Sequence, residues 1–268
     1  MRSFGKTARE SLVARPALWL AVATLLASAL FILHPRIDLD VARLFFRDGT
    51  GFPLAQLPFF ISLRRLGQAV SRLMAVLPVA ALLVPFLFAG ARFVFPPRAA
   101  LFLITSMLLG PGLVVNLLLK GYVGRARPNE IVDFGGSLDF SRAWEIVDHC
   151  AWNCSFVSAE AAASMQLVAL AFVVPPHWRR PVAIGALLFC LVMSVNRMAF
   201  GGHFLSDVVV AWLLTLWVMF AVHAVIYRAD GPFTDAAIAG TLERAGTWTK
   251  GMLGGIGGRV RRYVAIFR

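Results

Sequence analysis

The chain has 268 residues, of which 59% are hydrophobic and only 15% are charged, and its mean hydropathy is +0.75. Soluble globular domains average about 45–50% apolar and about 25% charged residues, so this composition excludes a soluble protein and predicts an integral membrane protein. The formal net charge of +12 does not indicate nucleic-acid binding, because the basic residues are scattered among apolar segments, and anionic membrane lipid is the expected partner.

Six apolar segments are long enough to span a bilayer as helices. They cover residues 16–34, 73–95, 99–119, 156–174, 181–200 and 208–227. We predict an all-α fold, a polytopic bundle of six transmembrane helices in which residues 1–268 form a single membrane-embedded domain. The N-terminal segment also resembles a signal peptide, but its apolar run is long enough to be retained as the first helix.

Two further segments combine basic and apolar residues. Residues 36–71 place several arginines among Phe, Leu and Ile, which predicts one or two short interfacial helices in the headgroup layer. These arginines serve either as lipid anchors or as substrate contacts, and the sequence leaves both roles open. Residues 228–268 have the pattern of a basic amphipathic tail on the inner leaflet.

The basic residues of the short connections predict the orientation of the bundle. With six helices, the N-terminal segment, the tail and two basic connections all fall on one side of the membrane. The basic residues of these connections are Arg92, Arg98, Arg179 and Arg180. We expect this side to be cytoplasmic, so that both termini lie inside.

A cluster of cations follows the third apolar segment, in the stretch K-G-Y-V-G-R-A-R-P. Lys120, Arg125 and Arg127 lie where two glycines and Pro128 end the helix. Spaced cations at a membrane surface suit a phosphate group, with arginine offering a bidentate fork and lysine a point charge. Anchoring to lipid headgroups is the commoner explanation when such a cluster is considered alone.

The polar loop of residues 129–155 contains Cys150 and Cys154 and leads into the fourth apolar segment. In an external loop, where the compartment is oxidising, cysteines at this spacing are expected to form a disulfide, with two free thiols as the alternative. The loop has neither the spacing nor the fourth ligand of a zinc site, so no metal is predicted. Ser158 and Glu160 lie at the mouth of the fourth helix, where a glutamate can also simply complement the helix dipole.

The last polar stretch, N-R-M-A-F-G-G-H-F-L-S-D, places Arg197, His203 and Asp207 between two apolar segments. Charged groups are costly there unless they have a function. His203 and Asp207 are four residues apart, so on a helix they share one face and the carboxylate can orient the imidazole as a nucleophile or base. The alternative is an ordinary ion pair at a helix end, with Arg197 as an interface anchor.

These polar groups all fall on the external membrane face if there are six helices. They lie where the third and fifth helices end and where the fourth and sixth helices begin. The bundle can therefore gather the following residues in one pocket: Lys120, Arg127, Ser158, Glu160, Arg197, His203 and Asp207. Three cations around a histidine describe a site for a phosphoryl group, because phosphoryl transfer depends on positioning and charge stabilisation.

With these motifs the chain resembles the type 2 phosphatidic acid phosphatase superfamily, membrane lipid phosphate phosphatases that are related to vanadium haloperoxidases. The resemblance covers about residues 70–227. The family motif K-x6-R-P is intact as Lys120 with Arg127 and Pro128.

The two other family motifs are matched to different degrees. The motif S-R-x5-H-x3-D is present as Arg197, His203 and Asp207, with Asn in place of the serine. Of the motif P-S-G-H only Ser158 matches, and Glu160 stands at the position of the histidine.

The resemblance implies a metal-independent phosphatase without a cofactor, in which His203 attacks phosphorus and becomes phosphohistidine while Asp207 supports it. The phosphate oxygens would be bound by Lys120, Arg127, Ser158 and Arg197. The histidine of P-S-G-H protonates the leaving group in the family, so we expect Glu160 to be the general acid here, with activity that favours acidic pH. The alternative is that Glu160 only orients a cation and that water donates the proton.

A membrane-spanning member with an external site resembles the bacterial enzymes that act on phosphatidylglycerol phosphate, undecaprenyl diphosphate or lipid A, the lipopolysaccharide anchor. The V-S-A-E variant and the basic aromatic loop most resemble lipid A phosphatases. The expected location is the bacterial inner membrane, with the active site in the periplasm. Two alternatives stay open: a lipid phosphotransferase that uses the same site, and a catalytically dead lipid-binding or transport protein.

Overall fold

The computed structural model describes residues 2–87, 93 and 95–249, and over these residues the fold is helical without a β-sheet. Five helices are long and apolar enough to cross a membrane, which confirms the all-α membrane fold. They are Pro16–Leu33 within α1 (Arg2–Leu33), Pro58–Leu83 within α3 (Pro58–Leu87), Pro97–Tyr122, α8 (Pro176–Ala199) and α9 (Leu205–Ile226).

The fourth predicted segment is a shorter helix than the sequence suggested. It runs through α6 (Ala159–Met165), η5 (Gln166–Ala169) and α7 (Leu170–Val173) without reaching the length of the other spans. Alanines dominate its first turns and are buried against α8 and α9. A helix enclosed by neighbouring helices does not need to match the full thickness of the lipid, so the predicted count of six spans corresponds to five spans and one enclosed helix.

The second predicted segment begins earlier than expected. Of residues 36–71, only α2 (Arg36–Arg43) and η1 (Pro53–Gln56) form the short helices that were predicted, whereas residues 58–71 are the first turns of α3. Residues 58–71 therefore belong to the same helix as the second predicted span. Arg64 and Gln68 interrupt the apolar pattern there because both donate hydrogen bonds to Glu160 of α6 (Ala159–Met165).

The third span combines α4 (Pro97–Met107), the π-helical stretch η2 (Leu108–Leu119) and α5 (Lys120–Tyr122). The widened stretch contains Gly110, Pro111 and Gly112, and a proline cannot make the backbone hydrogen bond of a regular α-helix. This span delivers Lys120 to the end of the bundle.

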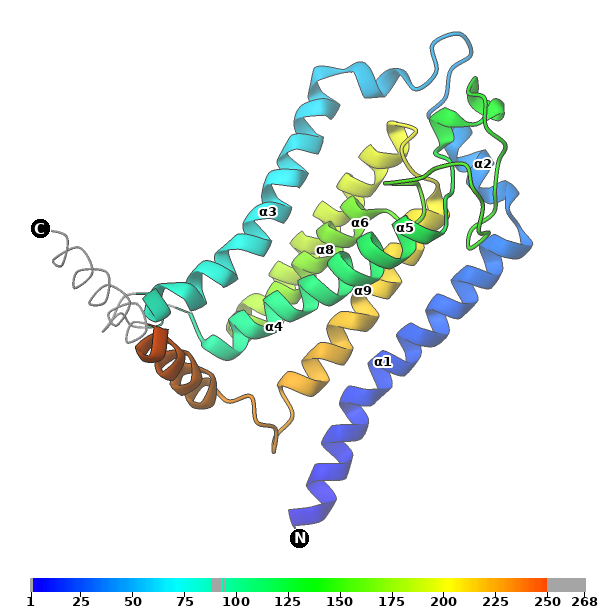
Figure 1. Ribbon diagram of the computed structural model, residues 1–268. Helices are drawn as coiled ribbons and strands as arrows, with labels where there is room; N and C mark the ends of the chain where they lie inside the picture. Colours follow the sequence, from blue (N-terminus) through cyan, green and yellow to red (C-terminus); the bar gives the residue numbers. More distant parts are fainter. Residues whose placement is uncertain (1, 88–92, 94, 250–268) are drawn as a thin grey trace, which may run out of the picture.

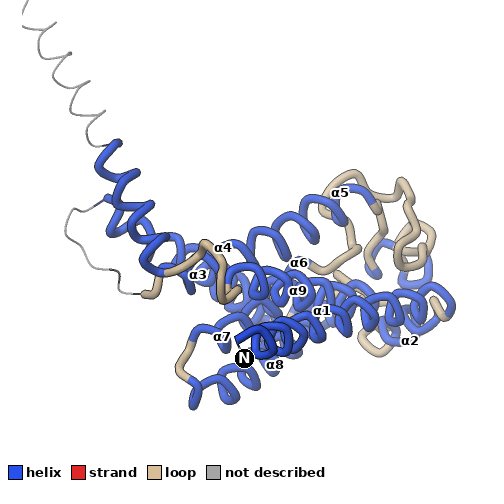
Figure 2. The backbone as a smooth tube through the Cα atoms, turned by 90° about the horizontal axis from the view of Figure 1, so that it is seen from below, coloured by secondary structure: helices blue, strands red, loops and turns tan. Residues whose placement is uncertain are grey.

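The helices run side by side, and α1 packs along α9 (Figure 1). The N-terminal end of α1 and the C-terminal end of α9 lie at the same end of the bundle, opposite to the end where α9 begins. Figure 2 shows the loops gathered around α2 and α5. Beneath these loops a small apolar cluster contains Phe52, Ile131, Phe134 and Phe204, which ties the loop layer to the start of α9.

Part of the predicted amphipathic tail lies outside the described residues. Residues 235–249 are helical, whereas the predictions made for residues 250–268 fall on the part of the chain that the structure does not describe. Arg98 connects the start of the tail to the bundle, because its backbone N–H donates to Asp235 at 2.9 Å and its guanidinium donates to the Ile226 carbonyl at 2.7 Å.

Candidate active site

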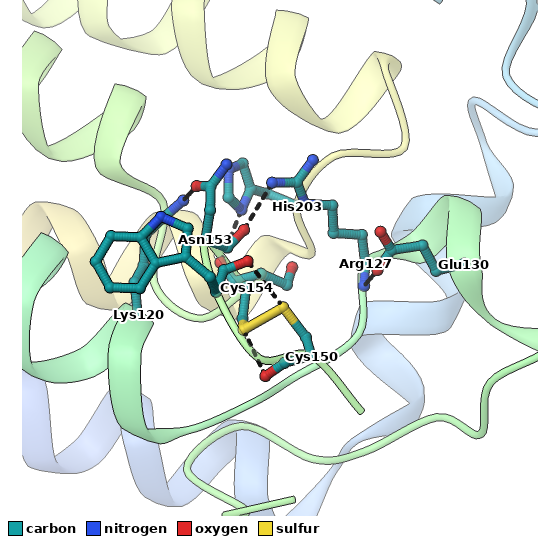
Figure 3. Close-up of a disulfide and its surroundings, with 9 residues drawn as sticks. Lys120, Arg127, Glu130, Cys150, Asn153, Cys154 and His203 are labelled. Atoms are coloured by element: carbon teal, nitrogen blue, oxygen red, sulfur yellow. Dashed lines mark hydrogen bonds between the residues drawn. A yellow bond between two sulfur atoms is a disulfide. The ribbon is translucent and has the colours of Figure 1, made fainter. Parts of the chain in front are cut away.

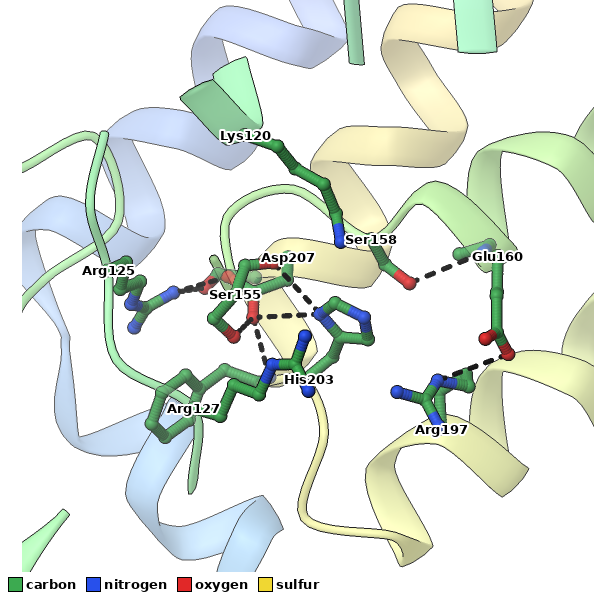
Figure 4. Close-up of polar contacts among 12 residues, drawn as sticks. Lys120, Arg125, Arg127, Ser155, Ser158, Glu160, Arg197, His203 and Asp207 are labelled. Atoms are coloured by element: carbon green, nitrogen blue, oxygen red, sulfur yellow. Dashed lines mark hydrogen bonds and ion pairs between the residues drawn. The ribbon is translucent and has the colours of Figure 1, made fainter. Parts of the chain in front are cut away.

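The polar residues singled out from the sequence lie close together in the structure (Figure 4). They come from the end of the third span, the loop after it, the start of α6, the end of α8 and the start of α9, as the predicted helix order requires. Figure 4 shows Lys120, Arg127 and Arg197 around the ring of His203.

His203 is held with its Nδ1 side against the protein. Its Nδ1 lies 2.9 Å from the carbonyl oxygen of Ser155 and 3.6 Å from the carboxylate of Asp207, and the side chain is 2% exposed. A carbonyl only accepts hydrogen bonds, so Nδ1 carries the proton and Nε2 carries the free lone pair. Burial lowers the pKa of His203 from 6.5 to about 4, which keeps the ring neutral and Nε2 nucleophilic.

Asp207 is fixed by several donors that face its carboxylate. Arg125 donates at 2.6 Å to Oδ1, while the backbone N–H of Phe204 at 2.8 Å and the hydroxyl of Ser155 at 2.5 Å donate to Oδ2. The carboxylate is completely buried. It therefore stays in place behind Nδ1 of His203 and stabilises positive charge that develops on the imidazole.

Arg125 has a different place from the two cations beside it in the sequence. Its fully buried guanidinium donates to Asp207, to the hydroxyl of Ser206 at 2.8 Å and to Asp38 of α2 at 2.9 Å. It also lies over the ring of Phe204, 4.2 Å from the centroid. Arg125 is thus a neutralising link between two carboxylates, and the sequence grouping of Arg125 with phosphate-facing cations is wrong.

Lys120 and Arg127 share one partner in the loop, Asn153. The ammonium group of Lys120 donates to the side-chain oxygen of Asn153 at 2.7 Å, and the guanidinium of Arg127 donates to its backbone carbonyl, also at 2.7 Å. Asn153 sits within the turn closed by the Cys150–Cys154 disulfide, in which the two Cα atoms are 5.6 Å apart (Figure 3). The predicted disulfide is confirmed, and it closes the turn that holds the two cations.

Glu160 lies between two guanidinium groups. It accepts from Arg64 of α3 at 3.1 Å and from Gln68 at 3.3 Å, and its second oxygen is 3.2 Å from Nε of Arg197. Two cations favour the ionised carboxylate, so this arrangement favours the role in which Glu160 orients Arg197. The role of Glu160 as general acid stays a prediction.

Two smaller features complete the pocket. The hydroxyl of Ser158 accepts from the backbone N–H of Ala161 at 3.3 Å, and the backbone N–H of Ser158 donates to the carbonyl of Asp207 at 3.0 Å. A Cβ at Gly202 would lie 2.4 Å from Nη2 of Arg197, so glycine is needed where the guanidinium crosses the turn before His203.

Sequence reasoning missed several partners of the predicted residues. They are Asp38, Arg64, Asn153 and Ser155. None of them belongs to a motif, and each contacts its partner across a large separation in the chain. One signal was available, because an aspartate in the helix of residues 36–43 is costly near lipid unless a cation meets it.

Comparisons with known proteins find a family model and related sequences. Residues 99–230 match the family model of the PAP2 superfamily. A lipid A 4'-phosphatase of Rhizobium leguminosarum is 35% identical over 209 residues, which cover 73% of this chain and 90% of that protein. A second lipid A 4'-phosphatase, from Rhizobium etli, is 40% identical over 119 residues, which are 44% of this chain and 46% of the relative.

A solved structure is also similar: the crystal structure of a transmembrane PAP2 type phosphatidylglycerolphosphate phosphatase from Bacillus subtilis. It matches with a TM-score of 0.48 and 18% identity over 80% of this chain and 97% of the other. From the family model and the Rhizobium leguminosarum relative, the chain belongs to the PAP2 superfamily. Within that superfamily it is a multi-pass membrane phosphatase, a phosphoric monoester hydrolase.

Proposed function

We propose that this membrane phosphatase removes a phosphate group from an envelope lipid, that lipid A is the substrate, and that His203 carries the phosphoryl group. The names of the relatives support the substrate. The observation that carries the mechanism is the 2.9 Å contact between Nδ1 of His203 and the Ser155 carbonyl, which places the proton on Nδ1 and leaves Nε2 free beside Lys120, Arg127 and Arg197.

In the first step, Nε2 of His203 attacks phosphorus and the bond between phosphorus and the lipid oxygen breaks. The lipid oxygen takes a proton as it leaves, and the phosphoryl group stays on the histidine. Asp207 stabilises the charge on the ring through the Nδ1 side. Lys120, Arg127 and Arg197 neutralise the phosphoryl oxygens, which is the main requirement of phosphoryl transfer.

In the second step, a water molecule attacks phosphorus, the N–P bond breaks and inorganic phosphate leaves. The water returns a proton to the group that protonated the lipid oxygen, so the site is regenerated. Glu160 acts as this proton donor only if Arg197 leaves Glu160 and binds the phosphate. The negative charge of the bound phosphate then favours the protonated carboxyl of Glu160. Otherwise Glu160 keeps Arg197 in place and water supplies the proton.

The orientation of the site is part of the proposal. The pocket lies at the end of the bundle opposite to the N-terminal end of α1. Because the basic connections and both termini follow the positive-inside rule when they are cytoplasmic, the pocket faces the periplasm of a bacterial inner membrane. A disulfide in the pocket fits this oxidising side.

Phosphate release by purified protein in detergent tests the proposed function. The substrates are lipid A, undecaprenyl diphosphate and phosphatidylglycerol phosphate, each assayed in EDTA and without an acceptor lipid. We expect release from lipid A and a loss of turnover in His203→Ala with substrate binding retained, because three cations still hold the phosphate. Loss of phosphate from lipid A only in the presence of an added acceptor lipid, with the phosphate recovered on that acceptor, would instead identify a phosphotransferase. A His203→Ala rate above about one tenth of the unaltered rate, less than about 1.4 kcal/mol of barrier, would exclude His203 as the nucleophile.

A further inference from the structure

A cavity of about 360 Å³ opens beside Lys120, next to the pocket for the reacting phosphate. Its lining consists of Gly112, Asn116, Leu117, Lys120, Trp152 and Asn153. Two other cavities described in the structure lie between helices and have no charged side chain in their linings. The cavity beside Lys120 therefore differs from these two cavities in having a charged residue in its lining.

The third span provides one wall of this cavity. Gly112, Asn116 and Lys120 follow each other at intervals of four residues, and the widened helix places them along one face. Asn116 is exposed within the apolar run L-V-V-N-L-L-L, at a position where a leucine would cost less in contact with lipid. An amide at this position has a clear use only if it meets a polar ligand.

The disulfide-closed turn provides the opposite wall. Trp152 is 75% exposed and stands beside Asn153 in the turn closed by Cys150 and Cys154. The covalently closed turn limits the movement of the backbone that carries Trp152, so the indole stays at the mouth of the cavity. Lys120 uses one of its three N–H groups on Asn153 and keeps the others for a ligand.

An aromatic face with amide and ammonium donors at its edge is complementary to a sugar ring. Such a ring has an apolar C–H face, which stacks on an indole, and hydroxyl groups at its rim, which bond to amides and cations. Since Lys120 belongs both to this cavity and to the phosphate pocket, a ring held here would carry its phosphate directly toward His203.

We infer that this cavity, here called the ring subsite, binds the sugar ring that bears the scissile phosphate. The ring subsite selects phosphorylated glycolipids over glycerophospholipids. The inference rests on the proposed phosphatase function, and it assigns substrate selection to Trp152 and Asn116. A tryptophan near the membrane surface can also act as an interfacial anchor, and the test separates the two roles.

The test compares two lipid substrates in the same detergent: a synthetic lipid that carries glucosamine 4-phosphate, and phosphatidic acid. Trp152→Ala and Asn116→Leu are the test variants, and both residues are exposed, so the fold should be retained. The matched controls are Trp178→Ala, an exposed tryptophan at the start of α8, and Leu118→Ala on the third span outside the cavity.

We expect kcat/KM for the sugar substrate to fall about tenfold in each test variant, mainly through KM, and kcat/KM for phosphatidic acid to stay within about twofold. The control variants should leave both values unchanged. Equal losses on both substrates would show an anchor and overturn the ring subsite, and so would unchanged kinetics. If the unaltered protein hydrolyses phosphatidic acid but not the sugar substrate, the ring subsite fails while the phosphatase function stands. Release from neither substrate would overturn the proposed function itself.

Discussion

The imidazole of His203 is buried, neutral and fixed in one tautomer, and these properties set the acidic limit of the reaction. The proposed nucleophile must be unprotonated to attack phosphorus, and burial holds the pKa of His203 at about 4. Activity should therefore be present above this pH and be lost as the pH falls through about 4, instead of near the ordinary value of 6.5.

The pH profile also decides the role of Glu160. If Glu160 is the general acid, kcat falls on the basic side as the carboxyl loses its proton, and Glu160→His moves this limb to higher pH while activity survives. If Glu160 only orients Arg197, the profile of Glu160→His keeps its basic limb. Profiles of kcat and kcat/KM for the unaltered and variant proteins provide the measurement, and near-normal rates in Glu160→Gln would show that the proton comes from elsewhere.

At the scale of elements, the short helix α2 is connected to the active site through a chain of charges. Asp38 accepts from Arg125 at 2.9 Å and from the backbone N–H of Ser206 at 2.8 Å, and Arg125 in turn holds Asp207. The helix thus acts on His203 without touching it. Arg125 keeps the carboxylate of Asp207 in place behind Nδ1 of His203, and this carboxylate favours the positive charge that develops on the imidazole.

Asp38→Asn should destabilise the protein by about 3 kcal/mol, because it removes one partner of a completely buried ion pair. It should also lower kcat, since Arg125 is then free to shift from Asp207. Asp40→Asn on the exposed side of the same helix is the matched control and should stay within about 0.5 kcal/mol. Thermal unfolding in detergent and phosphate release measure both effects, and equal behaviour of the two variants would contradict the link.

The disulfide-closed turn is the second element that acts through other residues. A turn of this length contributes little to stability by itself, but Asn153 within it holds Lys120 and Arg127. Replacing both Cys150 and Cys154 by Ser should raise KM about fivefold, equivalent to one lost hydrogen bond of about 1 kcal/mol, with a smaller effect on kcat.

Reductant separates the disulfide from other effects of the substitutions. The unaltered protein should show the same rise in KM when dithiothreitol is added, and the double variant should not respond to it. A KM of the unaltered protein that is insensitive to full reduction, checked by thiol labelling, would contradict a positioning role for the turn.

For the whole molecule, hydropathy predicted the helices well, because a lipid-facing helix must be apolar over its full length. It misplaced the start of α3, because Arg64 and Gln68 interrupt the apolar pattern. These two polar side chains bind Glu160 of α6, a partner that the local sequence does not reveal. It also predicted too great a length for the enclosed helix of residues 159–173, because its alanines resemble those of a membrane-spanning segment. The apolar pattern of a segment indicates whether its surroundings are apolar, but it does not indicate where in the membrane the helix begins or ends.

The candidate site was predictable where the residues belong to family motifs, and it was not predictable where they support these motifs. His203, Arg197 and Lys120 stand at the spacings of the family motifs. Asp38 and Asn153 reach them from loops and a short helix, and only the packing of the chain brings these partners together. Supporting residues of this kind have no fixed spacing from the residues that they hold, so they cannot be recognised from a single sequence.

The proposed orientation predicts the results of reporter fusions. Alkaline phosphatase fused after residue 145 should be active, because this loop is periplasmic, and a fluorescent protein fused after residue 234 should fluoresce in the cytoplasm. The reversed fusions should be silent. The opposite pattern in intact cells would place the pocket on the cytoplasmic face.

The most direct test of the mechanism is to trap the phosphorylated enzyme. Unaltered protein mixed with a lipid substrate that carries a radioactive phosphate should form, within one turnover, a protein-bound label that is stable in base and labile in acid, as a phosphohistidine is. Peptide mapping should locate the label on His203, and His203→Ala should bind the lipid without becoming labelled. Turnover in the unaltered protein without a labelled intermediate, or a label on another residue, would contradict transfer through His203.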